Sequence, residues 1–162
     1  MATEATSTID IDLPLEKSWE ILRDFTQAVN YVPNLTGCEL HPGPVAGKGA
    51  SRRVFRKNGK FLDETVTHWQ EKQGFVIRLH EGNGLAPAPF QEACFIYKIK
   101  PKGEKTQLTT TMSYTVRFGF LGQLLDKLLV KKALDGAVND IARNMKSYYE
   151  TGVPSNKTIT GK

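Results

Sequence analysis

Residues 121–149, with the sequence LGQLLDKLLVKKALDGAVNDIARNMKSYY, decide the predicted fold. Apolar side chains recur here every three or four residues, which is the spacing of one face of a helix. The predicted stripe comprises Leu121, Leu124, Leu125, Leu128, Leu129, Ala133, Ala137, Ile141, Met145 and Tyr148. A helix of this length extends about 43 Å, and Gly152 and Pro154 predict its end. Such a stripe needs a second layer to cover it.

The preceding part of the chain predicts that second layer. Between Gly37 and Phe118 the apolar pattern changes to a period of two, which is typical of strands. Asn58-Gly59 predicts a two-residue hairpin turn of type I′. The connections are short, so the strands form an antiparallel meander. They are predicted at Cys38–His41, Ser51–Lys57, Lys60–Glu71, Phe75–Glu81, Gln91–Pro101 and Thr106–Arg117.

A further strand and two short helices precede this meander. Thr8–Leu13 alternates between polar and apolar residues, and Pro14 suits the first turn of a helix that continues to Phe25. A second short helix is predicted at Gln27–Tyr31, ending before Pro33. The sequence thus predicts one α+β domain over residues 8–152, a flexible N-terminus at residues 1–7 and a flexible tail at residues 153–162.

Three short motifs resemble the START-like (SRPBCC) superfamily, of polyketide cyclase/dehydrase and lipid-transport type. They are Pro14-x4-Trp19-x2-Leu22-x-Asp24, Glu64-Thr65-Val66-Thr67-His68-Trp69 followed by Gly74-Phe75, and Phe120-Leu121-Gly122-x2-Leu125. Asp126 departs from the pattern, because a further apolar residue is common there. The resemblance implies a helix-grip (START/Bet v 1-like) fold, in which a curved seven-stranded antiparallel sheet wraps around a long C-terminal helix. It implies a cavity for an apolar molecule, and members differ widely in activity.

Composition narrows the function classes. The chain carries 22 Lys and Arg against 17 Asp and Glu, a net charge of +5, and lacks the interleaved aromatics of single-strand nucleic-acid binders. No segment has the length of a membrane span or the pattern of a secretory signal. Cys38 and Cys94 follow no metal or redox spacing, so we expect reduced thiols in a cytoplasmic protein that needs no metal or cofactor. Transient contact with a membrane surface stays open, as does a monomer or weak homodimer.

The hairpin turn predicts which strand residues face the cavity. With two residues in the turn, Phe55 lies opposite Leu62 and Arg53 lies opposite Glu64. His68 then shares their face. One interpretation is a polar patch in an apolar cavity, where Glu64 orients a ligand or acts as acid or base. The alternative is a structural cross-strand ion pair that contributes about 0.2–1 kcal/mol.

The candidate catalytic residues are Glu64, His68, Tyr97 and Tyr114. The pattern does not decide which face of the 91–101 strand points inward. The predicted function is binding of a lipid, isoprenoid, quinone or polyketide-like molecule. The alternatives are a polyketide aromatase/cyclase or dehydratase and an interaction module with basic faces. The predicted ligand-binding residues are Arg53, Phe55, Leu62, Glu64, Val66, His68, Phe75, Ile77, Leu79, Phe95, Tyr97, Met112, Tyr114, Ala133, Ala137 and Ile141.

Overall fold

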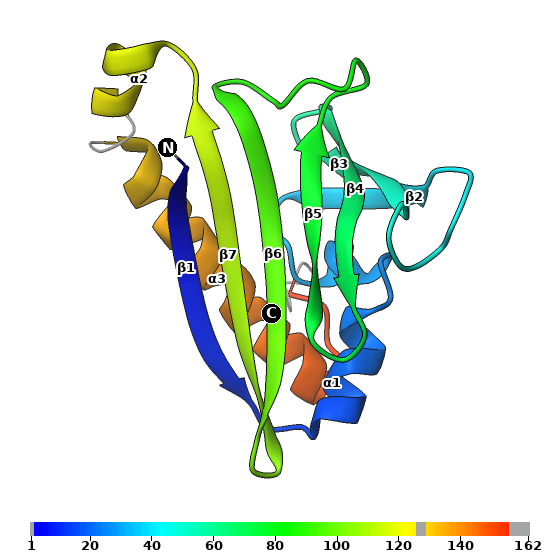
Figure 1. The fold of residues 1–162 in the computed structure, drawn as a ribbon. Helices are drawn as coiled ribbons and strands as arrows, with labels where there is room; N and C mark the ends of the chain where they lie inside the picture. Colours follow the sequence, from blue (N-terminus) through cyan, green and yellow to red (C-terminus); the bar gives the residue numbers. More distant parts are fainter. Residues whose placement is uncertain (1, 126–128, 156–162) are drawn as a thin grey trace, which may run out of the picture.

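The computed structural model describes residues 2–125 and 129–155. A long helix crosses one face of a curved sheet, and two short helical segments lie near one edge (Figure 1). In chain order the described elements are β1 (Thr3–Ile11), α1 (Leu15–Leu22), the 3₁₀ helix η1 (Gln27–Asn30), β2 (Leu35–Leu40), β3 (Ser51–Arg56), β4 (Phe61–Gln70), β5 (Gly74–His80), β6 (Phe90–Lys102), β7 (Lys105–Val116), α2 (Gly119–Leu125) and α3 (Lys131–Thr151).

The strands of the described chain form one seven-stranded sheet in the order β1-β7-β6-β5-β4-β3-β2. Every neighbouring pair is antiparallel, so the predicted meander is confirmed. β1 pairs with β7 from Thr3 to Ile11. The segment 1–7, predicted as flexible, therefore contributes to the sheet from Thr3 onward. The predicted tail at 153–162 lies outside the described residues from position 156 on.

The long helix α3 packs against β1 and β7 through a stripe that differs from the predicted one. Its buried residues are Val138, Ala142, Met145 and Tyr149. Of the predicted stripe in this half, only Met145 is buried; Ala133 and Ala137 are exposed, and Ile141 and Tyr148 are half-buried. The small residues of this half provide two adjacent faces of similar hydropathy, so the sequence pattern does not choose between them.

The leucine-rich first half of the predicted helix does not continue α3. Residues 119–125 form the separate helix α2, while 126–128 lie outside the described residues. A Cβ at Gly122 would lie 1.9 Å from the Arg117 carbonyl oxygen, so this glycine lets α2 fold tightly onto the end of β7. The side chains of Leu121, Leu124 and Leu125 are exposed rather than buried in the core.

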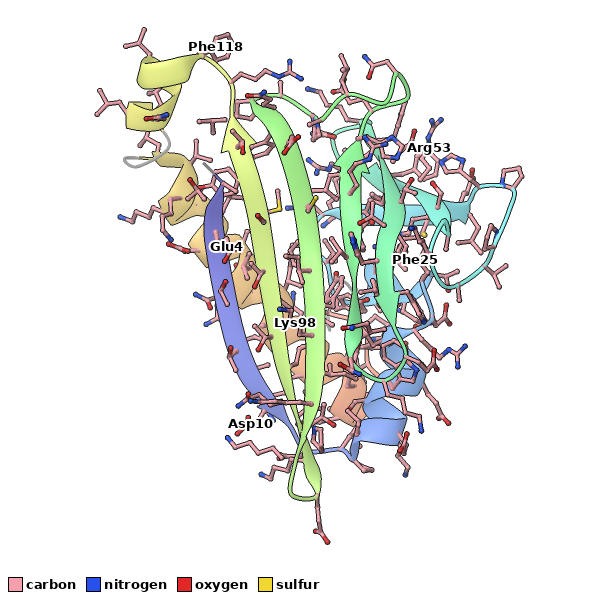
Figure 2. All side chains as sticks on the ribbon, in the orientation of Figure 1. Glu4, Asp10, Phe25, Arg53, Lys98 and Phe118 are labelled. Carbon is pink, nitrogen blue, oxygen red and sulfur yellow. The ribbon has the colours of Figure 1, made fainter. Side chains whose placement is uncertain are left out.

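The β3–β4 hairpin has a three-residue loop instead of the predicted two-residue turn. The Arg56 amide donates to the Lys60 carbonyl at 2.8 Å, and Gly59 adopts a φ of 78°. Phe55 therefore pairs with Phe61, and the register differs by one residue from the prediction. A shift of one residue moves each side chain to the other face of a strand. Arg53 and Phe55 thus face outward, and Arg53 lies at the molecular surface (Figure 2).

A β-bulge in β4 makes a second change of face. Val66 pairs with Ile77, but His68 pairs with Val76, so one extra residue is accommodated between them. His68 consequently points outward and is exposed, contrary to the prediction. Trp69 turns inward instead and stacks on Phe75, with ring centroids 5.1 Å apart. This aromatic layer joins the end of the β4–β5 hairpin to α1.

Candidate functional site

A buried ion pair lies on the inner face of the sheet, between β3 and β4. Arg52 pairs with Glu64 across the two strands, and its Nε donates to Glu64 Oε2 at 2.6 Å. Only 3% of the Arg52 side chain and 12% of the Glu64 side chain are exposed. The Arg52 Nη1 atom also donates to the Phe25 carbonyl. Charges this deeply buried are stabilised only when they are paired and hydrogen-bonded, and both conditions are met here.

Aromatic side chains surround the guanidinium. The Phe25 ring lies 4.0 Å from Arg52 Cζ, which is a cation–π contact. Burial is the largest influence and lowers the pKa of Arg52, but Glu64 together with Tyr31, Tyr97 and Cys38 raises that pKa above its usual value. Burial also raises the pKa of Tyr31 to about 12 and that of Tyr97 well above its usual value. Both phenols therefore keep their protons near neutral pH and can donate hydrogen bonds.

Two further inward hydroxyls have no hydrogen-bond partner among the described residues. Tyr149 Oη comes from α3, and Thr110 Oγ1 comes from β7, directly across from Tyr97. The Tyr149 ring packs edge-on against Tyr31, with centroids 6.2 Å apart. An unpaired buried hydroxyl is unfavourable by about 1–3 kcal/mol. These two groups are consequently available to a polar atom of a ligand.

The structure brings together only part of the predicted polar site. Glu64 and Tyr97 lie in the same cluster, but the arginine partner of Glu64 is Arg52 and not Arg53. Tyr114 faces inward as predicted and packs against Phe90, 5.3 Å between centroids, while His68 is outside. Sequence reasoning missed Arg52, Tyr31 and Tyr149. The three-residue hairpin loop was the feature needed to find Arg52.

The predicted apolar wall is largely on the inner face, although its role in binding stays a prediction. Leu62, Val66, Phe75, Ile77, Phe95 and Met112 are buried, and Leu79 is half-buried. The alternation of β6 is settled by burial, because Phe95, Tyr97 and Ile99 are buried while Cys94 and Ile96 are only half-buried. Both cysteines are free thiols.

A pocket of about 590 Å³ opens beside the first half of α3. Pro33 and Asn34 form one wall, and the other wall includes Leu129, Lys132, Ala133, Gly136, Ala137 and Asp140. Ala133 and Ala137, predicted to line an internal cavity, therefore line this open pocket. Pro33 follows Tyr31 by two residues, so one short segment connects the pocket wall to the aromatic cluster around Arg52.

Comparison with known proteins decides the family. Residues 2–150 match the family model described as polyketide cyclase / dehydrase and lipid transport. The chain belongs to this family. A search of curated proteins finds no match. Membership of the polyketide cyclase/dehydrase and lipid-transport family suggests ligand binding or a cyclase-like activity, and the ligand has to be inferred from the residues of this member.

Solved structures show the same helix-grip fold. Ginseng major latex-like protein 151 from Panax ginseng has a TM-score of 0.70 and 16% identity, covering 91% of this chain and 97% of its own. A START superfamily protein from Mycobacterium smegmatis has a TM-score of 0.68 and 17% identity, covering 93% and 99%. DynU16, from the dynemicin biosynthetic locus, has a TM-score of 0.65 and 22% identity, covering 94% of this chain and 49% of its own. At these identities the likeness shows the fold alone.

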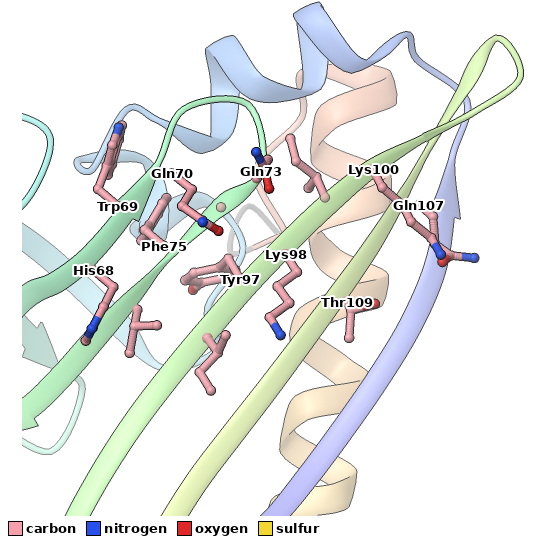
Figure 3. A pocket seen from close by; sticks show the side chains of 14 residues that line it. His68, Trp69, Gln70, Gln73, Phe75, Tyr97, Lys98, Lys100, Gln107 and Thr109 are labelled. Atoms are coloured by element: carbon pink, nitrogen blue, oxygen red, sulfur yellow. The ribbon is translucent and has the colours of Figure 1, made fainter.

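This family member also has a hollow of about 820 Å³ on the outer face of the sheet, opposite α3 (Figure 3). Gly74 and the outward side chains of His68, Lys98 and Thr109 are among the residues that line it. The predicted ligand residue His68 thus belongs to this outer hollow. Because Lys98 and His68 are exposed, the hollow is a solvated surface groove.

A second polar cluster lies on the outer face. Asp63 accepts hydrogen bonds from Arg53 Nε at 2.8 Å and Nη2 at 2.9 Å, and its Oδ1 lies 3.1 Å from His41 Nε2. The Arg53 hydrogen bonds, opposed by burial and aided by His41, hold the pKa of Asp63 below its usual value. Across residues 2–125 and 129–155, no three His, Cys, Asp or Glu side chains are grouped to hold a metal ion. We interpret this cluster as structural.

Proposed function

We propose that the protein binds a small apolar molecule with one polar end, between the inner face of the sheet and α3. The observation that carries this proposal is the Arg52–Glu64 pair, buried among aromatic side chains that include Tyr31, against which Tyr149 packs. Replacing a buried ion pair by apolar residues is often neutral or stabilising. A role in recognising a ligand gives a reason for this chain to keep the pair.

The groups at the site favour a hydroxyl or carbonyl as the polar end of the ligand. The protonated phenols of Tyr97 and Tyr149 can donate to a carbonyl oxygen, and the Glu64 carboxylate can accept from a hydroxyl. The wall formed by Leu62, Phe75 and the other buried inner-face residues suits an apolar body. A lipid, isoprenoid, quinone or polyketide-like molecule has this combination of features.

Native mass spectrometry of the purified protein, followed by solvent extraction, tests the proposal. We expect a non-covalent passenger at one molecule per chain. Tyr149→Phe should weaken rebinding of the extracted passenger about five- to tenfold, the value of one hydrogen bond at about 1 kcal/mol. Tyr148→Phe is the matched control: its hydroxyl already donates to Gln27 Oε1 at 2.7 Å, so affinity should stay unchanged. Equal affinity loss in both variants would contradict the assigned site.

Acid–base catalysis on the same ligand is the second candidate, because Glu64 and Tyr97 lie in one cluster and the family includes cyclases and dehydrases. Glu64→Gln separates the two. If Glu64 only lines the site, the affinity for the extracted passenger changes by a few-fold. If Glu64 acts as acid or base, product formation from that passenger is abolished while binding persists.

A further inference from the structure

One end of the molecule presents a group of exposed apolar side chains from α2 and the residues beside it. Phe118 is 78% exposed, Leu121 69% and Leu129 67%, while Leu124 and Leu125 are about half exposed. We call these five residues the leucine face. Figure 2 shows Phe118 projecting at this end. A contiguous apolar group of this kind is unusual on a soluble monomer and marks a contact surface.

The connection between β5 and β6 lies at the same end of the molecule as the leucine face (Figure 1). The Arg117 Nη2 atom donates to the Ala86 carbonyl at 2.9 Å, and its Nε donates to the Phe90 carbonyl at 2.7 Å. These bonds hold the connection beside the start of α2, at the same end of the molecule (Figure 1). Leu85, which precedes Ala86, is 58% exposed. Leu85 is thus a further exposed apolar side chain on this connection.

The charge around the leucine face is positive. Among the described residues at positions 117–125 and 129–132, three are basic, Arg117, Lys131 and Lys132, and none is acidic. Lys131 also pairs with Asp135 one turn further along α3, Nζ to Oδ1 at 3.0 Å. Apolar side chains flanked by lysines match the interface of an anionic bilayer, where acyl chains lie beneath negative headgroups.

The leucine face adjoins the open pocket described above. Leu129 and Lys132 line that pocket, and Leu129 is also part of the leucine face. A bilayer resting on the face would therefore lie at the pocket opening. This continuity gives an apolar molecule a route between bilayer and pocket with little exposure to water.

We propose that the leucine face docks the protein onto an anionic lipid bilayer. A second copy of the chain fits the face less well, because a two-fold contact brings the Lys131 and Lys132 side chains of both copies together. Lipid phosphates attract the same lysines, by about fivefold in affinity for each lysine. The docking does not require the pocket to hold a ligand.

Co-sedimentation with vesicles tests the docking. Vesicles of phosphatidylcholine with phosphatidylglycerol should bind the wild-type protein, and vesicles of phosphatidylcholine alone should not. The double variant Leu121→Ser/Leu124→Ser should lose binding about tenfold or more. Its control is Val45→Ser, because Val45 is 70% exposed on the β2–β3 connection. All three serines replace exposed side chains, so thermal unfolding should stay close to that of the wild type.

The charge requirement is tested by Lys132→Gln, which should weaken binding to the anionic vesicles about fivefold. The control is Lys98→Gln on the outer face, which should leave binding unchanged. Equal binding to neutral vesicles, or equal loss in variant and control, overturns the proposal. A second outcome also overturns the proposal. In it, the wild-type protein does not bind vesicles but forms a dimer at high concentration, and the variant Leu121→Ser/Leu124→Ser does not form that dimer. A passenger extracted from a protein that does not bind vesicles would leave the proposed function standing.

Discussion

The buried pair of Arg52 and Glu64 gives the sharpest test of the site. In Glu64→Gln the Arg52 side chain, which is 3% exposed, loses its carboxylate partner, and the Phe25 carbonyl, the Phe25 ring and the Tyr97 hydroxyl that remain carry no negative charge. Removing one member of a buried pair destabilises a protein by about 3–5 kcal/mol. For a chain of this size each 1 kcal/mol lowers Tm by about 2–4 °C. We therefore expect a fall in Tm of roughly 6–20 °C.

Replacing both partners should recover that stability. In Arg52→Met/Glu64→Met no charge remains at these two positions and the side-chain volumes are similar, so the free energy of unfolding should return to the wild-type value or exceed it by about 1–4 kcal/mol. If the pair recognises the polar end of a ligand, the same double variant loses the passenger. A stable protein that no longer binds would thus separate function from folding.

Urea unfolding followed by tryptophan fluorescence measures these changes, because Trp19 is buried and Trp69 packs against it at 5.1 Å. The matched control is Lys102→Gln, which breaks the exposed Lys102–Asp10 pair and should leave stability close to that of the wild type, because solvent screens this pair. A loss in Glu64→Gln no larger than in this control would refute the burial argument. So would a double variant as unstable as the single one.

Two further changes test other parts of the sheet. Gly74→Ala places a Cβ 1.9 Å from the Tyr97 carbonyl oxygen at a φ of 135°, so urea unfolding should show a loss of at least about 2 kcal/mol. The pKa of Asp63 is lowered in the folded state, chiefly by the hydrogen bonds from Arg53. The ionised Asp63 therefore stabilises the fold fully above the unfolded pKa of 3.8, and this stabilisation is lost as the pH falls through the lower, folded pKa. In Asp63→Asn the free energy of unfolding should depend less on pH in that acid range. The same pH dependence in variant and wild type would contradict the role given to Asp63.

Much of the fold was predictable because it depends on periodicity. The change from period two to a helical spacing, with short connections between strands, was sufficient for the antiparallel order and for a helix across the sheet. The helix from Leu15 and the short helix at Gln27 were predicted correctly for the same reason. The start of β1 was not, since Thr3–Ser7 has few apolar residues and is held by pairing with β7.

The site was harder to predict, because one residue more or less in a loop or strand decides which face of the sheet a side chain occupies. Asn58-Gly59 marked the hairpin correctly, but the extra loop residue moved Arg53 outward and Arg52 inward. The bulge after Val66 then reversed the face of His68. The apolar alternation marks neither feature, because Asn-Gly is compatible with a two-residue turn and with a longer loop, and a bulge inserts a single residue. Glu64 kept its predicted face only because it lies between the two irregularities.

The misplaced residues share a physical cause that bears on function. A buried arginine and a row of exposed leucines both contradict the hydrophobic pattern, and natural sequences contradict it mainly where function requires. Burying the Arg52 guanidinium removes a charge from water, which costs free energy, and Leu121 and its neighbours expose apolar surface to water. Neither helps this chain to fold. A polar ligand group at Arg52 and a bilayer at the leucine face would offset both disadvantages, which is why the two variants proposed at these positions measure binding as well as stability.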